Sequence, residues 1–184
     1  DSGIDNIEIS GGTYEQPRLL GLDKVSINPK RSENRKESTI AREAYFLSYA
    51  EEIAKVVNIP LMVTGGFRTK EGMEAALRDG ACEIVGVGRP LCANPYAIKE
   101  LLSGQIDELP KYEKTLSIGP WWLSPTSPFR LIQAINAFSA QAWFYQQIKK
   151  MGKGLMPDLN LKPWKAFRED AKADQKAIKE YQNF

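Results

Sequence analysis

Three short runs of apolar and β-favouring residues divide the first 104 residues of the chain. They lie at residues 5–10, 60–66 and 82–88, and glycines stand at or directly after the end of each run. The run at 60–66 shows no alternation of polar and apolar side chains, which is typical of a strand buried on both faces of a parallel sheet. We therefore expect three strands, each leaving the sheet through a glycine-bearing loop.

Between and after these runs, apolar residues recur at the spacing of a helix face. The clearest segment is 41–57, where they are separated by one, three or four positions. A second, shorter helix is expected after a Thr69 cap, and a third between an Asn94–Pro95 start and Gly104. The apolar face of segment 41–57 consists of Phe46, Tyr49, Ala50, Ile53 and Val57.

The succession of strand, loop and helix thus occurs three times in residues 1–104, which predicts an α/β fold with a parallel sheet. Residues 105–184 follow another pattern. A connector rich in Pro, Trp and Ser precedes a long helix at 129–151 and a charged segment at 163–184, which we also expect to be helical. We therefore expect two domains, with the βα units in 1–104 and a connector plus a helical carboxyl-terminal extension in 105–184.

Composition and charge narrow the functional classes. A net charge of +2 over 184 residues is too small to favour nucleic acid or an anionic membrane as a partner, and no apolar run is long enough to span a bilayer. The chain has no histidine, the commonest general base and metal ligand, so we expect no metal site. Cys82 and Cys92 form neither a CxxC motif nor a disulfide framework, which predicts inert thiols in a reducing compartment, the cytoplasm.

Two of the glycine loops have the composition of an anion site. Gly65 and Gly66 follow one expected strand, and Gly88 and Arg89 follow the next. Backbone N–H groups at a helix start bind phosphate, glycine lets the anion approach closely, and arginine adds a permanent charge, so we expect these four residues to hold one phosphate group. Tight βα turns without a ligand are the alternative. Neither loop matches a P-loop or a complete GxGxxG pattern, which argues against ATP and against a Rossmann NAD site.

Four segments between residues 5 and 95 together carry a specific family resemblance. Their sequences are "DNIEISGGTYEQP", "REAYFLSYAEEI", "IPLMVTGGFRTKEGMEAAL" and "CEIVGVGRPLCANP". They resemble the carboxyl-terminal part of the Old Yellow Enzyme family, the FMN-dependent NADH:flavin oxidoreductases and ene-reductases built on a (β/α)8 barrel. A weaker resemblance continues in "AWFYQQIKKMGKGLMPDLNLKPW", at residues 142–164.

The resemblance implies a place in the barrel and a cofactor. The three strands would be the sixth, seventh and eighth, so that residues 1–104 form the carboxyl-terminal part of a TIM barrel. Gly65 and Gly66 in one loop, and Gly88 and Arg89 in the next, would hold the phosphate of FMN. NAD(P)H would reduce the FMN, which would pass a hydride to an activated alkene such as an enone. Residues 105–160 contain no cysteine, which argues against the iron–sulfur cluster of some larger members.

The first five strands of such a barrel have no counterpart in the chain, and in the family those strands carry the catalytic residues. We therefore name no catalytic residue. Three situations are compatible with this pattern. The chain is part of a longer protein, or another polypeptide or an oligomer supplies the missing amino-terminal half of the barrel, or the chain is a truncated, non-catalytic relative that retains only the phosphate half-site.

Two further functions stay open on the residues alone. Another phosphate-binding barrel, such as an aldolase or isomerase, would use the same loops, although no expected strand end carries the lysine that forms a Schiff base in many such enzymes. An interaction module would use the broadly apolar helix at 129–151, with Trp121 and Trp122 upstream, as a dimer face or at a membrane surface. Packing of that helix over the outside of a barrel is the plainer interpretation.

Overall fold

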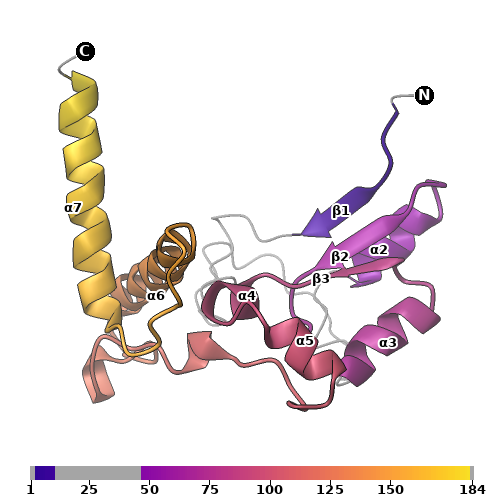
Figure 1. Ribbon diagram of the computed structural model, residues 1–184, viewed down its shortest axis with the longest axis horizontal. Coiled ribbons are helices and arrows are strands. Elements are labelled where there is room, and N and C mark those ends of the chain that lie inside the picture. Colours follow the sequence, from indigo (N-terminus) through magenta and orange to yellow (C-terminus); the bar gives the residue numbers. More distant parts are fainter. Residues whose placement is uncertain (1–2, 11–46, 183–184) are drawn as a thin grey trace. The chain divides into compact units, whose positions relative to one another are not determined.

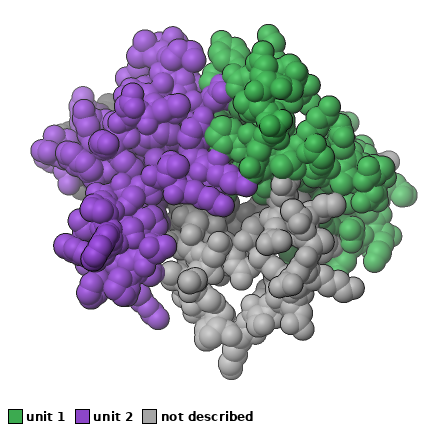
Figure 2. All heavy atoms as spheres, turned by 90° about the horizontal axis from the view of Figure 1, so that it is seen from below, with its two compact units in different colours: residues 1–16, 26–91, 95–110 green, residues 17–25, 92–94, 111–184 purple. Residues whose placement is uncertain are grey.

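The computed structural model describes residues 3–10 and 47–182 (Figure 1). The chain separates into two compact units, coloured in Figure 2. Among the described residues, unit 1 comprises 3–10, 47–91 and 95–110, and unit 2 comprises 92–94 and 111–182. Each unit has a hydrophobic core of its own, so each is described separately.

Unit 1 contains a sheet of three parallel strands in the order in which they follow one another along the chain. The strands are β1 (Ile7–Ser10), β2 (Leu61–Thr64) and β3 (Ile84–Gly86) (Figure 1). Each lies inside one of the three runs that predict strands, and the parallel α/β arrangement is confirmed. It is consistent with a fragment of a TIM barrel, while the position of these strands in a complete barrel stays a prediction.

Helices follow the strands, as the periodicity predicts, with one difference. The helices that the structure describes before residue 105 are α2 (Leu47–Ala54), α3 (Lys70–Arg78), α4 (Arg89–Ala93) and α5 (Ala97–Leu102). Residues 92–94, which include the end of α4, belong to unit 2. The Thr69 hydroxyl accepts a hydrogen bond from the backbone N–H of Gly72 at 3.1 Å, which confirms Thr69 as the cap of α3. Residues 41–46 of the first expected helix lie outside the described residues.

The expected helix start at Asn94–Pro95 is wrong. A first short helix, α4, begins at Arg89, three residues after the end of β3, and at its start the N–H of Leu91 donates to the carbonyl of Gly88 at 2.9 Å. Proline has no N–H with which to continue such a helix, and α5 begins only at Ala97, after Tyr96 as the capping residue. The Asn–Pro pair therefore separates two short helices instead of opening one.

The sheet buries one face against α2 and α3. Leu61 and Val63 are buried with Ala50 of α2 and Ala76 of α3, and Ile7, Ile9 and Val85 pack against this cluster. The opposite face carries the row Glu8, Met62 and Ile84, of which Ile84 is 41% exposed. Met62 and Thr64 of β2 are half-buried on this second face, so the expectation that residues 60–66 are buried on both faces is met only in part.

Unit 2 is built on two long helices that pack on each other, α6 (Arg130–Met151) and α7 (Pro163–Gln182). Both expected helices are thereby confirmed, and α6 ends where Gly152 follows it. Trp143 is 1% exposed and forms the centre of the core, together with Tyr112 and Phe144. The two rings lie 6.0 Å and 5.2 Å from that of Trp143, the second edge-on. No described helix is long and apolar enough to cross a bilayer.

Candidate functional site

Both glycine loops leave the sheet at the same edge. Gly65 and Gly66 directly follow β2, and Gly88 and Arg89 come two and three residues after the end of β3. β2 and β3 are hydrogen-bonded neighbours in which Thr64 is paired with Gly86. The carboxyl ends of neighbouring parallel strands are where α/β proteins bind ligands. The fold therefore brings the two predicted loops to one edge of the sheet.

The first loop requires glycine through its backbone. Gly65 has a φ of 126° and Gly66 a φ of 85°, conformations that side chains with a Cβ rarely adopt. The end of this loop is tied down, because the N–H of Leu109 donates to the carbonyl of Arg68 at 2.7 Å. The two glycines thus form a turn of defined shape between β2 and α3, with or without a ligand.

Gly88 is a glycine for a different reason. It is exposed, its φ lies outside the left-handed range, and a Cβ built on it meets no atom within 4 Å. Neither the packing nor the backbone of the described chain therefore demands glycine at this position. The open space beside Gly88 is available to a bound group, and Arg89 begins α4 immediately after it.

The structure adds a second arginine to the region. Arg68 is only 6% exposed, and its Nη1 donates to the carbonyl of Phe67 at 2.8 Å. Sequence reasoning named Arg89 as the cation of the site and left Arg68 out, although Arg68 stands two residues after Gly66. The sequence did not single out Arg68, because residue spacing alone does not distinguish a buried guanidinium from a solvated one.

Thr64 is the other residue that sequence reasoning missed. Its hydroxyl oxygen is buried and has no hydrogen-bond partner in the part of the chain that the structure describes. The residue lies at the carboxyl end of β2, directly before Gly65. Together, an unsatisfied hydroxyl, open space at Gly88 and two arginines fit an anionic, oxygen-rich ligand such as the phosphate of FMN.

The cysteine and acidic residues of the described chain form no metal centre, and Cys82 is not a reactive thiol. Cys82 is buried, and both its burial and the charge of Glu83 raise the pKa of its thiol, so that it stays protonated at neutral pH. Among the described residues, no group of histidine, cysteine and carboxylate side chains could hold a metal ion.

Comparison with known proteins agrees with the resemblance. No protein-family model matches the chain. It is 44% identical over 103 residues to the NADH-dependent flavin oxidoreductase iliE of Hypocrea jecorina, covering 55% of this chain and 24% of the relative. It is 31% identical over 157 residues to the NADH-dependent flavin oxidoreductase iccE of Talaromyces variabilis, covering 83% and 35% respectively. Over 151 residues it is 30% identical to an NADH oxidase of Thermoanaerobacter brockii, covering 82% and 21%.

These matches cover most of this chain in two cases, but only a part of each relative. The chain spans between about a fifth and about a third of the length of these curated relatives. The longer alignments cover more than four fifths of the chain and therefore extend beyond the βα units of unit 1.

Proposed function

The chain is homologous to one part of the NADH-dependent flavin oxidoreductases, and on this basis we propose that it supplies the FMN-phosphate site of such an enzyme. Gly65, Gly66, Gly88 and Arg89 would hold the phosphate. The bound FMN would carry a hydride from NAD(P)H to an activated alkene such as an enone. The protein's contribution from this chain is to bind and orient the cofactor.

One observation carries the proposal: a chain homologous to flavin oxidoreductases places its two glycine loops at the same edge of neighbouring parallel strands. Fixed backbone amides and a guanidinium suit a dianion because they stay in place without a ligand and provide charge-assisted hydrogen bonds. The glycine at position 88 supports the assignment further, since the described chain itself has no steric need for it.

The remaining barrel strands would come from a longer protein or from another polypeptide. Among the described strands, β1 and β3 form the two edges of the sheet, and each pairs on one side only. Unpaired strand edges readily accept further strands, so further barrel strands have a place to add. The alternative is a non-catalytic relative that retains the phosphate half-site alone, which would bind FMN without oxidising NAD(P)H.

The proposal is tested by replacing Gly88 in the 184-residue chain. We expect the wild-type chain to quench the fluorescence of added FMN, and Gly88→Ala to weaken binding by tenfold or more, because the new methyl group enters the space assigned to the phosphate. Gly152→Ala is the matched control: its Cβ would meet only ordinary contacts at 3.5 and 3.7 Å in unit 2. Neither substitution should lower the melting temperature without FMN by more than a few degrees.

A chimaera removes the ambiguity of a partial barrel. In it, this chain replaces the matching segment of the iliE relative from Hypocrea jecorina, and flavin retention is read from the visible absorption spectrum. A folded chimaera that stays colourless after reconstitution with FMN would overturn the proposal. A yellow chimaera in which Gly88→Ala has no effect on FMN affinity would overturn the assignment of the site.

A further inference from the structure

We infer that the hydroxyl of Thr64 is a further ligand of the bound nucleotide and donates a hydrogen bond to a phosphate oxygen. The inference rests on the proposed function, because it concerns the same loop after β2. Its basis is a buried oxygen without a partner in the described chain, placed directly before the two glycines that follow that strand.

The backbone places Thr64 on the face of the sheet that points away from α2 and α3. In the parallel register, Thr64 is paired with Ser10 on one side and with Gly86 on the other, in the last row before the strands end. The neighbouring residue Val63 points into the core with α2 and α3, and side chains alternate along a strand, so Thr64 points away from that core. The hydroxyl therefore lies at the ligand-binding edge, on the face that α2 and α3 do not cover.

An unsatisfied buried hydroxyl is unusual in a folded protein. The large majority of buried polar side-chain atoms have a hydrogen-bond partner, since leaving one unpaired is destabilising. Valine has nearly the same shape as threonine and would occupy this position without a polar atom to satisfy. A threonine here is explained when its hydroxyl gains a partner from outside the described chain, and a phosphate oxygen is an acceptor of the required kind.

The close packing of Gly86 gives a second indication that the Thr64 side chain has a fixed position at the end of β2. A Cβ built on Gly86 would lie 1.8 Å from Oγ1 and 2.7 Å from Cβ of Thr64, and 2.8 Å from Cε of Met62. The threonine side chain therefore leans across β3, into the space where any other residue at position 86 would have its side chain. Glycine at 86 keeps the hydroxyl at the end of β2, next to the loop assigned to the phosphate.

The chain offers a matched control in Ser139 of α6. Its hydroxyl is also buried without a partner among the described residues, but Ser139 lies in α6 of unit 2 and belongs to neither of the loops assigned to the phosphate. Removing either hydroxyl relieves an unpaired polar group, so Thr64→Val and Ser139→Ala should both leave the melting temperature of the ligand-free chain unchanged or raised. Only the Thr64 substitution should change FMN affinity.

The experiment measures the dissociation constants of FMN and of riboflavin by fluorescence for the wild type, Thr64→Val, Thr64→Ser, Ser139→Ala and Gly88→Ala. We expect Thr64→Val to weaken FMN binding about tenfold to a hundredfold, the range for a lost hydrogen bond to a charged group. Thr64→Ser keeps the hydroxyl and should bind FMN within about threefold of the wild type. Riboflavin lacks the phosphate, so its affinity should be the same for wild type and Thr64→Val.

The outcomes separate this inference from the proposed function. If Thr64→Val binds FMN as tightly as the wild type while Gly88→Ala loses it, the inference is overturned and the phosphate site stands. An equal loss of FMN and riboflavin affinity in Thr64→Val overturns the phosphate contact. If the 184-residue chain binds neither ligand, the same variants are measured in the iliE chimaera, where a folded protein without FMN affinity overturns both.

Discussion

At the scale of single residues, the glycines after β2 and in and after β3 differ in why the position is a glycine. Gly65 and Gly66 are required by backbone conformation, Gly86 by the side chain that leans over it, and Gly88 by nothing within the described chain. In the sequence these four positions look alike, since each lies in or at the end of an apolar run. Only coordinates separate a glycine that shapes a turn from one that leaves space for a ligand.

Replacing Gly86 by alanine should destabilise unit 1. The added methyl group would lie 1.8 Å from the Thr64 hydroxyl oxygen, so the strand or the threonine must move. Overpacking of this kind typically costs about 1–3 kcal/mol. The measurement is the free energy of unfolding from urea denaturation followed by far-ultraviolet circular dichroism. Gly88→Ala, two residues further along, should change it by less than about 0.5 kcal/mol, as is usual for surface substitutions; equal effects of the two substitutions would contradict this explanation.

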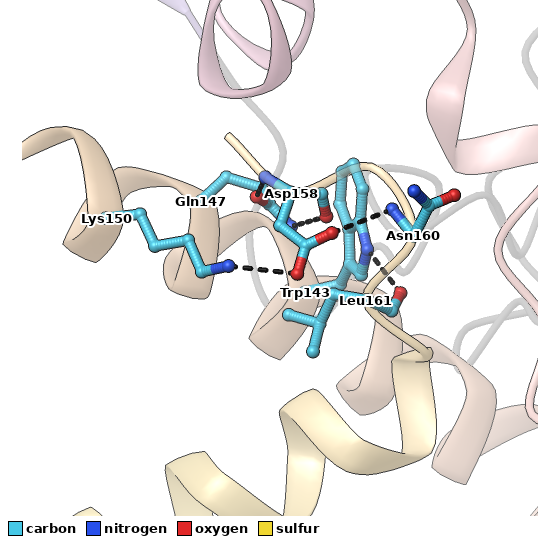
Figure 3. A network of polar contacts seen from close by, with 6 residues as sticks. All are labelled: Trp143, Gln147, Lys150, Asp158, Asn160 and Leu161. Carbon is cyan, nitrogen blue, oxygen red and sulfur yellow. Dashed lines mark hydrogen bonds and ion pairs between the residues drawn. The ribbon is translucent and has the colours of Figure 1, made fainter. Parts of the chain in front are cut away.

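At the scale of elements, unit 2 shows how polar side chains fix the connection between two helices. Gln147 of α6 is fully buried, and its side-chain amide forms two hydrogen bonds with the backbone of Asp158 (Figure 3). The amide nitrogen donates to the carbonyl at 3.1 Å, and the amide oxygen accepts from the N–H at 2.6 Å. One turn earlier, the indole of Trp143 donates to the carbonyl of Leu161 at 2.9 Å. The segment between α6 and α7 is thus held from its middle to its end.

The same segment carries an ion pair that should make unit 2 sensitive to acid. Lys150 lies 3.0 Å from a carboxylate oxygen of Asp158, and its hydrogen bond holds the pKa of Asp158 below the usual value, against the opposing effect of burial. Because the pKa is lower in the folded state, the ionised carboxylate stabilises the fold above the pKa of the unfolded chain. That contribution is lost as the pH falls through the folded pKa.

We therefore expect unit 2 to lose stability as the pH falls below about 4, the ordinary range of an aspartate. All four tryptophans lie at or beyond residue 121, so tryptophan fluorescence during thermal unfolding reports on unit 2 alone. Lys150→Met should flatten this pH dependence, whereas the control Lys153→Met should leave it unchanged. The same slope in Lys150→Met as in the wild type would show that the ion pair does not cause it.

Element types followed from hydrophobic periodicity, while burial within them did not. The runs around β1, β2 and β3 and the helices α6 and α7 were predictable because their patterns are long or bounded by glycine and proline. Within α6, however, Trp143 is buried whereas the apolar residues Phe138 and Ile148 are 55% and 45% exposed. The helix instead buries the polar residues Asn136, Ser139 and Gln147, of which Asn136 and Gln147 form hydrogen bonds with partners far along the chain.

The sequence likewise predicted only part of the candidate site. Gly65, Gly66, Gly88 and Arg89 follow from the rule that loops after parallel strands bind ligands, and the structure places both loops at one edge. Thr64 was hidden because a threonine at a strand end is ordinary, and its unpaired oxygen becomes visible only with the packing around it. Asn94–Pro95 misled because these residues separate two short helices, α4 and α5, and the second begins only after Tyr96.

At the scale of the whole molecule, the chain has two units with separate cores, and the candidate site lies in one of them. Unit 1 contains the parallel sheet and both loops, while unit 2 contains α6, α7 and the core around Trp143. The sheet has three strands and two edges, and the chain spans about a third or less of the curated flavin oxidoreductases it matches. The rest of a barrel would therefore have to meet this chain at the sheet of unit 1.

This division predicts where a bound cofactor stabilises the chain. FMN held by the loops of unit 1 should slow amide hydrogen exchange in β2, β3 and the residues that follow them, because a ligand that binds only the folded state adds about 2.7 kcal/mol at a hundred times its dissociation constant. The amides of α6 and α7 lie in a unit with its own core and should exchange at the same rate with and without FMN. Gly88→Ala measured at the same FMN concentration is the control, and protection in unit 1 should be lost in it. Protection that appears in α6 instead would place the ligand in unit 2 and would contradict a phosphate site built from the loops after β2 and β3.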